Sequence, residues 1–97
     1  MSIDGTVDYS GLPEYMQDTA RLYVERGIPG GSFFTAVVTN DFKGAFAKAD
    51  DTNTRFMRAW AMWLYNEAPN GCHGSPQKVA DWIALGGMAA FTKPASA

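Results

Sequence analysis

Residues 27–50, GIPGGSFFTAVVTNDFKGAFAKAD, decide the fold, because they contain the run that most resembles a β-strand. The run SFFTAVVT, residues 32–39, holds two Phe, two Val and two Thr, and these residue types favour strands. A strand needs a partner for its row of backbone N–H and C=O groups, and no second run of this kind occurs in the chain. If residues 32–39 form a strand, it pairs across two subunits.

A helix fits the same residues better. The adjacent pairs Phe33–Phe34 and Val37–Val38 break the strict alternation of a strand. Apolar residues instead recur at helical spacings of three and four: Phe34, Val38, Phe42, Ala45, Phe46 and Ala49. Ser32 is a good N-cap residue. We therefore predict a helix from about Phe33, with a break near Asn40–Asp41, since Asn and Asp favour caps and turns.

The flanking segments also have helical patterns. A first helix is expected to begin at Pro13, with Ser10 or Leu12 as its cap, and to end at Gly27. Another helix begins at residues 50–52 and ends before Pro69. Between residues 56 and 65 it is apolar nearly all round. A last helix begins with Ser75 as N-cap and stops at residues 86–87. The prediction is an all-α fold, a compact bundle of four to five short helices.

The length of 97 residues fits a single domain, 1–97. Residues 1–9 are expected to form a flexible arm, and residues 88–97 a frayed tail with Phe91 as a docking residue. The predicted core consists of the large apolar residues on the helical stripes: Phe34, Val38, Phe46, Phe56, Trp60, Leu64, Val79 and Ile83.

Composition limits the classes of function. Charged residues make up 19% of the chain, below the roughly 25% of an average domain. The net charge of −2 disfavours binding to nucleic acid, which needs an excess of Lys and Arg. No apolar run is long enough to span a membrane and the N-terminus lacks a signal-peptide pattern, so we expect a cytoplasmic protein. The low charge and the apolar residues 56–65 lead us to expect a homodimer.

Cys72 and His73 are the obvious reactive pair, but their pattern does not favour catalysis. Neighbouring side chains on a loop diverge, and the partners of a Cys–His dyad usually come from distant parts of a chain. A zinc site needs about four ligands, and one Cys with one His falls short. We interpret GCHG as a structural turn. No catalytic residue, metal site or cofactor is predicted, and we expect the protein not to be an enzyme.

Arg55 and Arg58 form the most suggestive cluster, together with the aromatic residues Trp63 and Tyr65. Arg and Trp are enriched at binding hot spots, although the Trp residues of a small domain are more often part of the core. Lys78, in the first turn of the last helix, completes the predicted binding surface. The alternatives are a small-ligand protein that sequesters a nucleotide between Arg and an aromatic ring, and a nucleic-acid-binding helical domain.

Two segments carry a family resemblance: YMQDTARLYVERGIPGGSFFTAVVTNDFKGAFAKADD, residues 15–51, and WLYNEAPNGCHGSPQKVADWI, residues 63–83. They resemble small accessory proteins encoded by tailed bacteriophages and prophages, a family to which no activity is attached. The resemblance implies expression in the cytoplasm of a bacterial host and a role in binding and inhibiting a bacterial host or defence protein. It supplies no catalytic residue.

Overall fold

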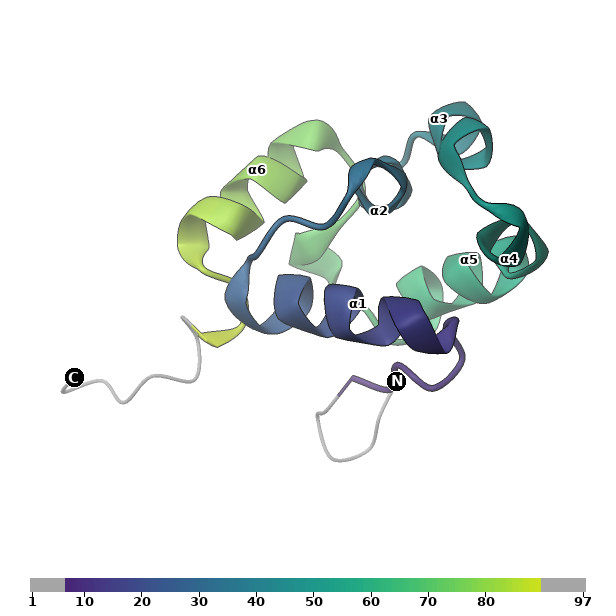
Figure 1. The fold of residues 1–97 in the computed structure, drawn as a ribbon. Coiled ribbons are helices and arrows are strands. Elements are labelled where there is room, and N and C mark those ends of the chain that lie inside the picture. Colours follow the sequence, from purple (N-terminus) through teal and green to yellow (C-terminus); the bar gives the residue numbers. More distant parts are fainter. Residues whose placement is uncertain (1–6, 90–97) are drawn as a thin grey trace, which may run out of the picture.

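A computed structural model describes residues 7–89, and the predicted all-α fold is confirmed (Figure 1). The described residues contain helices and turns but no strand. The elements in chain order are α1 (Glu14–Arg26), α2 (Ser32–Val38), α3 (Phe42–Lys48), α4 (Asp51–Arg55), α5 (Met57–Asn66), the 3₁₀ turn η1 (Asn70–Cys72) and α6 (Pro76–Leu85). The described part thus has six short α-helices, because two predicted helical segments are each divided in two.

The strand-like run 32–39 forms helix α2, and the predicted break follows it. Asn40 adopts a left-handed conformation with φ 66°, and the Asp41 N–H turns back to the carbonyl oxygen of Ala36. The Asp41 side chain then caps α3 by accepting a hydrogen bond from the Gly44 N–H. Ser32 is the first residue of α2 rather than its cap, a position taken by Gly31 without a side-chain hydrogen bond. The break therefore changes the direction of the chain between two seven-residue helices.

The predicted helix after residue 50 is also divided, at Phe56, which leaves helical geometry with φ −98° and ψ 11°. Asp50 caps α4 by accepting the Asn53 N–H at 2.7 Å. The Tyr15 hydroxyl donates to the Asp50 carboxylate, which ties α1 to α4. This hydrogen bond and that of Asn53 lower the pKa of Asp50.

The expected ends of the first and last helices are mostly confirmed. Helix α1 ends at Gly27, whose φ of 69° suits glycine, but its N-cap position holds Pro13 with no side-chain cap, so the prediction of Ser10 or Leu12 was wrong. Ser75 Oγ accepts the Lys78 N–H at the start of α6, and the helix ends at Gly86 with φ 91°.

The C-terminal ends of α1 and α6 meet closely at a pair of glycines. A Cβ atom on Gly87 would lie 2.5 Å from the backbone nitrogen of Gly27, too close for any side chain. The Met88 N–H donates to the carbonyl oxygen of Val24 at 2.9 Å just beyond this contact. We call this contact the glycine seam, and it fixes α6 against α1.

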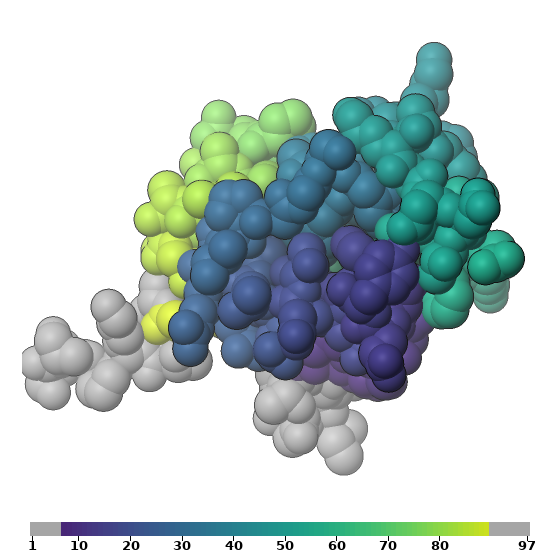
Figure 2. All heavy atoms as spheres, in the orientation of Figure 1, coloured from purple at the N-terminus to yellow at the C-terminus, as the bar shows by residue number. Residues whose placement is uncertain are grey.

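The core is aromatic. Phe34 lies edge-to-face against Tyr23, with ring centroids 5.2 Å apart, and against Trp60 at 5.9 Å. The indole N–H of Trp60 donates to Asn53 Oδ1, which gives the carbonyl oxygen of this buried side chain a partner. Trp82 Nε1 donates to the Tyr23 carbonyl oxygen, so α6 is anchored to α1 from inside. Figure 2 shows α1 and the segment after it covering the near face of the molecule, with α6 on one side and α3–α4 on the other.

Most of the predicted core is confirmed, with one error. Four residues are buried and three are partly buried against the core: Phe34, Val38, Trp60 and Val79, then Phe56, Leu64 and Ile83. Phe46 is 43% exposed, because the turn at Asn40 orients α3 so that Ala45 faces inward instead.

The flexible arm was predicted too long. Val7 and Tyr9 pack against the core, and the Asp8 N–H donates to Glu67 Oε1 at 3.0 Å. Met88, in the predicted tail, is also partly buried. Residues 1–6 and 90–97, including Phe91, lie outside the described part of the chain. Between residues 7 and 89, no helix has the length and apolar character needed to cross a lipid bilayer.

Candidate functional site

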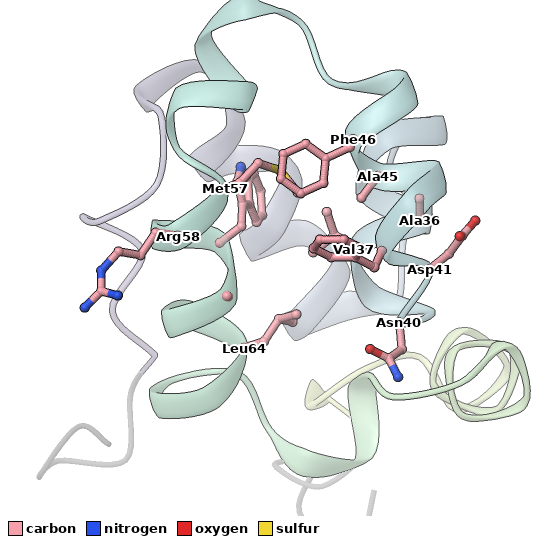
Figure 3. A pocket seen from close by; sticks show the side chains of 12 residues that line it. Ala36, Val37, Asn40, Asp41, Ala45, Phe46, Met57, Arg58 and Leu64 are labelled. Carbon is pink, nitrogen blue, oxygen red and sulfur yellow. The ribbon is translucent and has the colours of Figure 1, made fainter.

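A pocket of about 320 Å³ lies between α5 on one side and α2–α3 on the other (Figure 3). We call it the α3–α5 groove. The α5 wall is one face of the helix, because its contributors follow helical spacing: Met57, Arg58, Trp60, Ala61 and Leu64. The opposite wall is Ala36, Val37, Asn40, Asp41, Phe42, Ala45 and Phe46. Nine of these twelve side chains are apolar, so the groove is an apolar site.

Two phenylalanines on α3 make this wall unusual. Phe42 is 71% exposed and Phe46 is 43% exposed, and their rings contact each other edge-to-face at 5.0 Å. They extend from a helix that buries only Ala45 in the core. Two neighbouring aromatic rings left in water beside an apolar pocket are typical of a surface that a partner covers.

Charge is confined to the edges of the groove. Arg58 lies at the outer edge of the α5 wall and Asp41 at the edge of the α3 wall, and both point away from the middle of the pocket (Figure 3). Among the ion pairs of residues 7–89, none involves Arg58. Arg58 is also exposed, so its guanidinium group is available to an acidic group of a partner.

The predicted site residues do not form one surface. Arg58 lines the groove, whereas Arg55 is exposed in the last turn of α4 and is not part of the lining. Tyr65, on α5, is 85% exposed but also lies outside the groove. Lys78 is exposed on α6, which lies on the far side of α2 from α4 and α5 (Figure 1). No single cationic face joins it to the two arginines.

Trp63 is 4% exposed, and this burial removes it from the candidate surface. Its ring contacts Trp60 at 6.0 Å edge-to-face and Tyr9 at 6.0 Å in a tilted arrangement. Its indole N–H is buried without a hydrogen-bond partner in the described structure. Trp63 therefore acts as a core residue.

The Cys72–His73 turn is structural and lacks the features of a reactive site. Cys72 is fully buried, and its burial raises the pKa of the thiol to about 12, so the reactive thiolate does not form near neutral pH. The Tyr23 hydroxyl donates to the Cys72 carbonyl oxygen at 2.6 Å. Burial, and then the nearby Lys78, lower the pKa of His73. No group of three His, Cys, Asp or Glu side chains within residues 7–89 could hold a metal ion.

The search for similar proteins gives no further guide, since no protein-family model, curated protein or solved structure matches the chain.

Sequence reasoning found Arg58 but missed the groove itself. The segment FKGAF places two Phe four residues apart with only Lys, Gly and Ala between them. A seven-residue helix with such small and polar neighbours cannot bury both rings on its own, and this signal could have marked α3 as a surface element.

Proposed function

We propose that this protein acts by binding another protein through the α3–α5 groove, without chemistry of its own. The observation that carries the proposal is the exposed pair Phe42 and Phe46 beside an apolar pocket of about 320 Å³. Clustered apolar side chains in a concave site, with an Arg at the rim, are features of protein-binding hot spots. The protonated, buried thiol of Cys72 is consistent with a non-enzymatic role.

The resemblance of residues 15–51 and 63–83 to bacteriophage accessory proteins suggests the class of partner. We infer that the partner is a bacterial host or defence protein in the cytoplasm and that binding inhibits it. In this proposal, inhibition results from binding itself. The groove covers an apolar segment of the partner that the partner needs for its own contacts.

A small-ligand function is the second candidate, because a volume of about 320 Å³ lies within the roughly 300–1,000 Å³ of ligand pockets. A nucleotide fits the site poorly. Its phosphates need several cationic or N–H donors, and Arg58 is the single cationic side chain among the lining residues of the described chain.

The test is capture from a bacterial lysate with three immobilised proteins: wild type, Phe42→Ser and Leu85→Ser. Leu85 is a matched control, since it is exposed and apolar but lies on α6. All three should have the same helical circular dichroism and melting temperature. We expect wild type and Leu85→Ser to retain the same host protein and Phe42→Ser to lose it.

Equal capture by Phe42→Ser, or no specific capture by wild type, would overturn the proposal. In the second case, a titration of the wild type with nucleotides and small aromatic compounds decides whether the groove is a ligand site.

A further inference from the structure

The dimensions of the groove indicate the shape of its occupant. The apolar residues of the α5 wall are Met57, Trp60, Ala61 and Leu64, at positions i, i+3, i+4 and i+7, and Trp60, only 1% exposed, forms its floor. These seven steps correspond to about 10 Å along the helix axis, or two turns. A second helix presents apolar side chains at the same spacing over the same length, so its ridges match the grooves of this wall.

The backbone of the walls supports a helical occupant over an extended one. The walls are helices, joined on one side by the turn at Asn40–Asp41, and the N–H groups of this turn donate to the carbonyl oxygens of Val37 and Ala36. The described chain has no strand edge to offer. An extended peptide in this groove would face apolar side chains with its own N–H and C=O groups unpaired. A helix satisfies its backbone internally and presents only side chains.

Ala61 allows a helix to approach closely. It is exposed in the middle of the α5 wall, between the larger side chains of Met57 and Leu64. Packed helix axes lie about 8–10 Å apart, and the smaller distances need small side chains at the contact. A bulky apolar side chain of the occupant can therefore rest over Ala61 and against Phe42.

The charged residues around the groove indicate the sign of the occupant's net charge. Residues 41–58 contain Lys43, Lys48, Arg55 and Arg58 and three acidic residues, Asp41, Asp50 and Asp51. The Asp41 and Asp50 carboxylates already accept the capping hydrogen bonds of α3 and α4, whereas none of the four cations takes part in the ion pairs of residues 7–89. This segment thus has a net charge of +1 in a chain whose net charge is −2. It contains α3, one wall of the groove, and the start of α5, the other wall. An acidic occupant is electrostatically complementary to this region.

A second copy of the chain fits the groove less well. A two-fold interface places the same patch on both subunits, so the cations of residues 41–58 would face one another. The exposed parts of Phe42 and Phe46 together amount to about one aromatic side chain, roughly 200 Å². A stable interface usually buries about 800 Å² on each partner. A single helix needs less surface than a folded subunit.

We propose that the α3–α5 groove binds one acidic amphipathic α-helix of the partner protein. Three apolar side chains of this helix, at i, i+3 or i+4, and i+7, lie between Phe42 and the α5 face, and an Asp or Glu on its flank pairs with Arg58. This inference rests on the proposed protein-binding function and specifies the segment that the protein recognises.

The test uses a displayed library of 18-residue helices that share one apolar stripe and have random polar positions. The bait proteins are wild type, Arg58→Glu and the control Arg26→Glu, which makes the same charge change at an exposed site on α1. We expect wild type and Arg26→Glu to enrich Asp and Glu at the positions flanking the stripe. Arg58→Glu should remove or reverse this enrichment.

The affinity of one selected helix, made as a labelled peptide, gives the size of the effect in fluorescence anisotropy. We expect Arg58→Glu to weaken binding at least fivefold, an effect that added salt reduces, and Phe42→Ser to abolish binding. Enrichment of Lys and Arg on wild type, or selection unchanged by Arg58→Glu, would overturn the assignment of an acidic helix.

Other outcomes separate this inference from the proposed function. If no helix is selected while lysate capture still depends on Phe42, the groove binds a partner of another shape and the helical occupant is rejected. If analytical ultracentrifugation shows a dimer that Phe42→Ser dissociates, the groove is occupied by a second copy, and the foreign helix is also rejected.

Discussion

Helices α2 and α3 are consecutive, have seven residues each, and carry two phenylalanines each. The two pairs of phenylalanines differ in burial. Phe33 and Phe34 of α2 are buried at 7% and 1% exposure and contact the ring of Trp60. Phe42 and Phe46 of α3 contact each other and are 71% and 43% exposed. The difference arises at the turn between the helices, where Asn40 and Asp41 change the direction of the chain.

This contrast separates the residues that hold the fold from those available for binding. The rings of α2 join α1 and α5 to one core, and their burial contributes to the free energy of folding. The rings of α3 contribute less to that free energy, because 71% of Phe42 and 43% of Phe46 stay hydrated. Substitutions can therefore address stability and binding independently.

The largest expected effect compares one phenylalanine from each helix. Phe34→Ala should lower the free energy of unfolding by about 3–5 kcal/mol, since it removes a fully buried ring. Phe42→Ala should change it by less than about 0.5 kcal/mol, as for other surface positions. Urea unfolding followed by circular dichroism measures both values. Similar losses for the two variants would show that α3 belongs to the core and would break the comparison.

Substitutions in the glycine seam test how strongly the contact between α6 and α1 stabilises the fold. Gly86 and Gly87 both have positive φ, so an Ala at either position should cost about 1–2 kcal/mol from backbone strain. At Gly87 the new Cβ also meets backbone atoms of Gly27 and Arg26 at 2.5 and 2.6 Å, whereas at Gly86 it enters open space. Gly87→Ala should therefore cost about 1–3 kcal/mol more than Gly86→Ala.

Thermal melting of the two glycine variants provides the measurement, with Gly86→Ala as the matched control. Peptide binding by Gly87→Ala at low temperature should remain intact, because the seam lies away from the groove. Equal melting temperatures for the two variants would mean that α6 separates from α1 with little loss of free energy. The seam would then not stabilise the fold.

The smallest expected effect lies between two neighbouring tryptophans of α5. Trp60→Phe loses the indole N–H donor to the buried Asn53, whereas Trp63→Phe loses an N–H that has no partner in the described structure. Both changes remove the same volume from the core. Trp60→Phe should therefore be less stable than Trp63→Phe by about 1 kcal/mol. A double variant with Asn53→Ala would remove this difference if the hydrogen bond is its source.

The sequence was sufficient to predict which segments are helical, but not the break at Phe56 or the directions in which the helices point. Ser75, Gly27 and Gly86 are local signals, and each ends or begins a helix where the pattern indicated. The absence of a pairing partner correctly decided residues 32–39 in favour of a helix. These predictions succeed because capping and backbone pairing are settled by near neighbours or by simple elimination.

The site depended on geometry that spacing does not determine. Phe46 continues the apolar period of residues 34–42, but the left-handed turn at Asn40 shifts the register, and Ala45 takes the inward position. The break at Phe56 similarly places Arg55 and Arg58 on different helices. Trp63 and Tyr65 are two residues apart on α5, so one faces the core and the other faces water.

The burial of Cys72 has a consequence for measuring the motions of this protein. It is the single thiol of the chain, and η1 holds it beneath the Tyr23 side chain that bonds to its carbonyl oxygen. An alkylating reagent such as iodoacetamide reaches the sulfur only in molecules where η1 has separated from α1. The rate of alkylation therefore reports the frequency of this local opening in the unlabelled protein, and its temperature dependence distinguishes local opening from global unfolding.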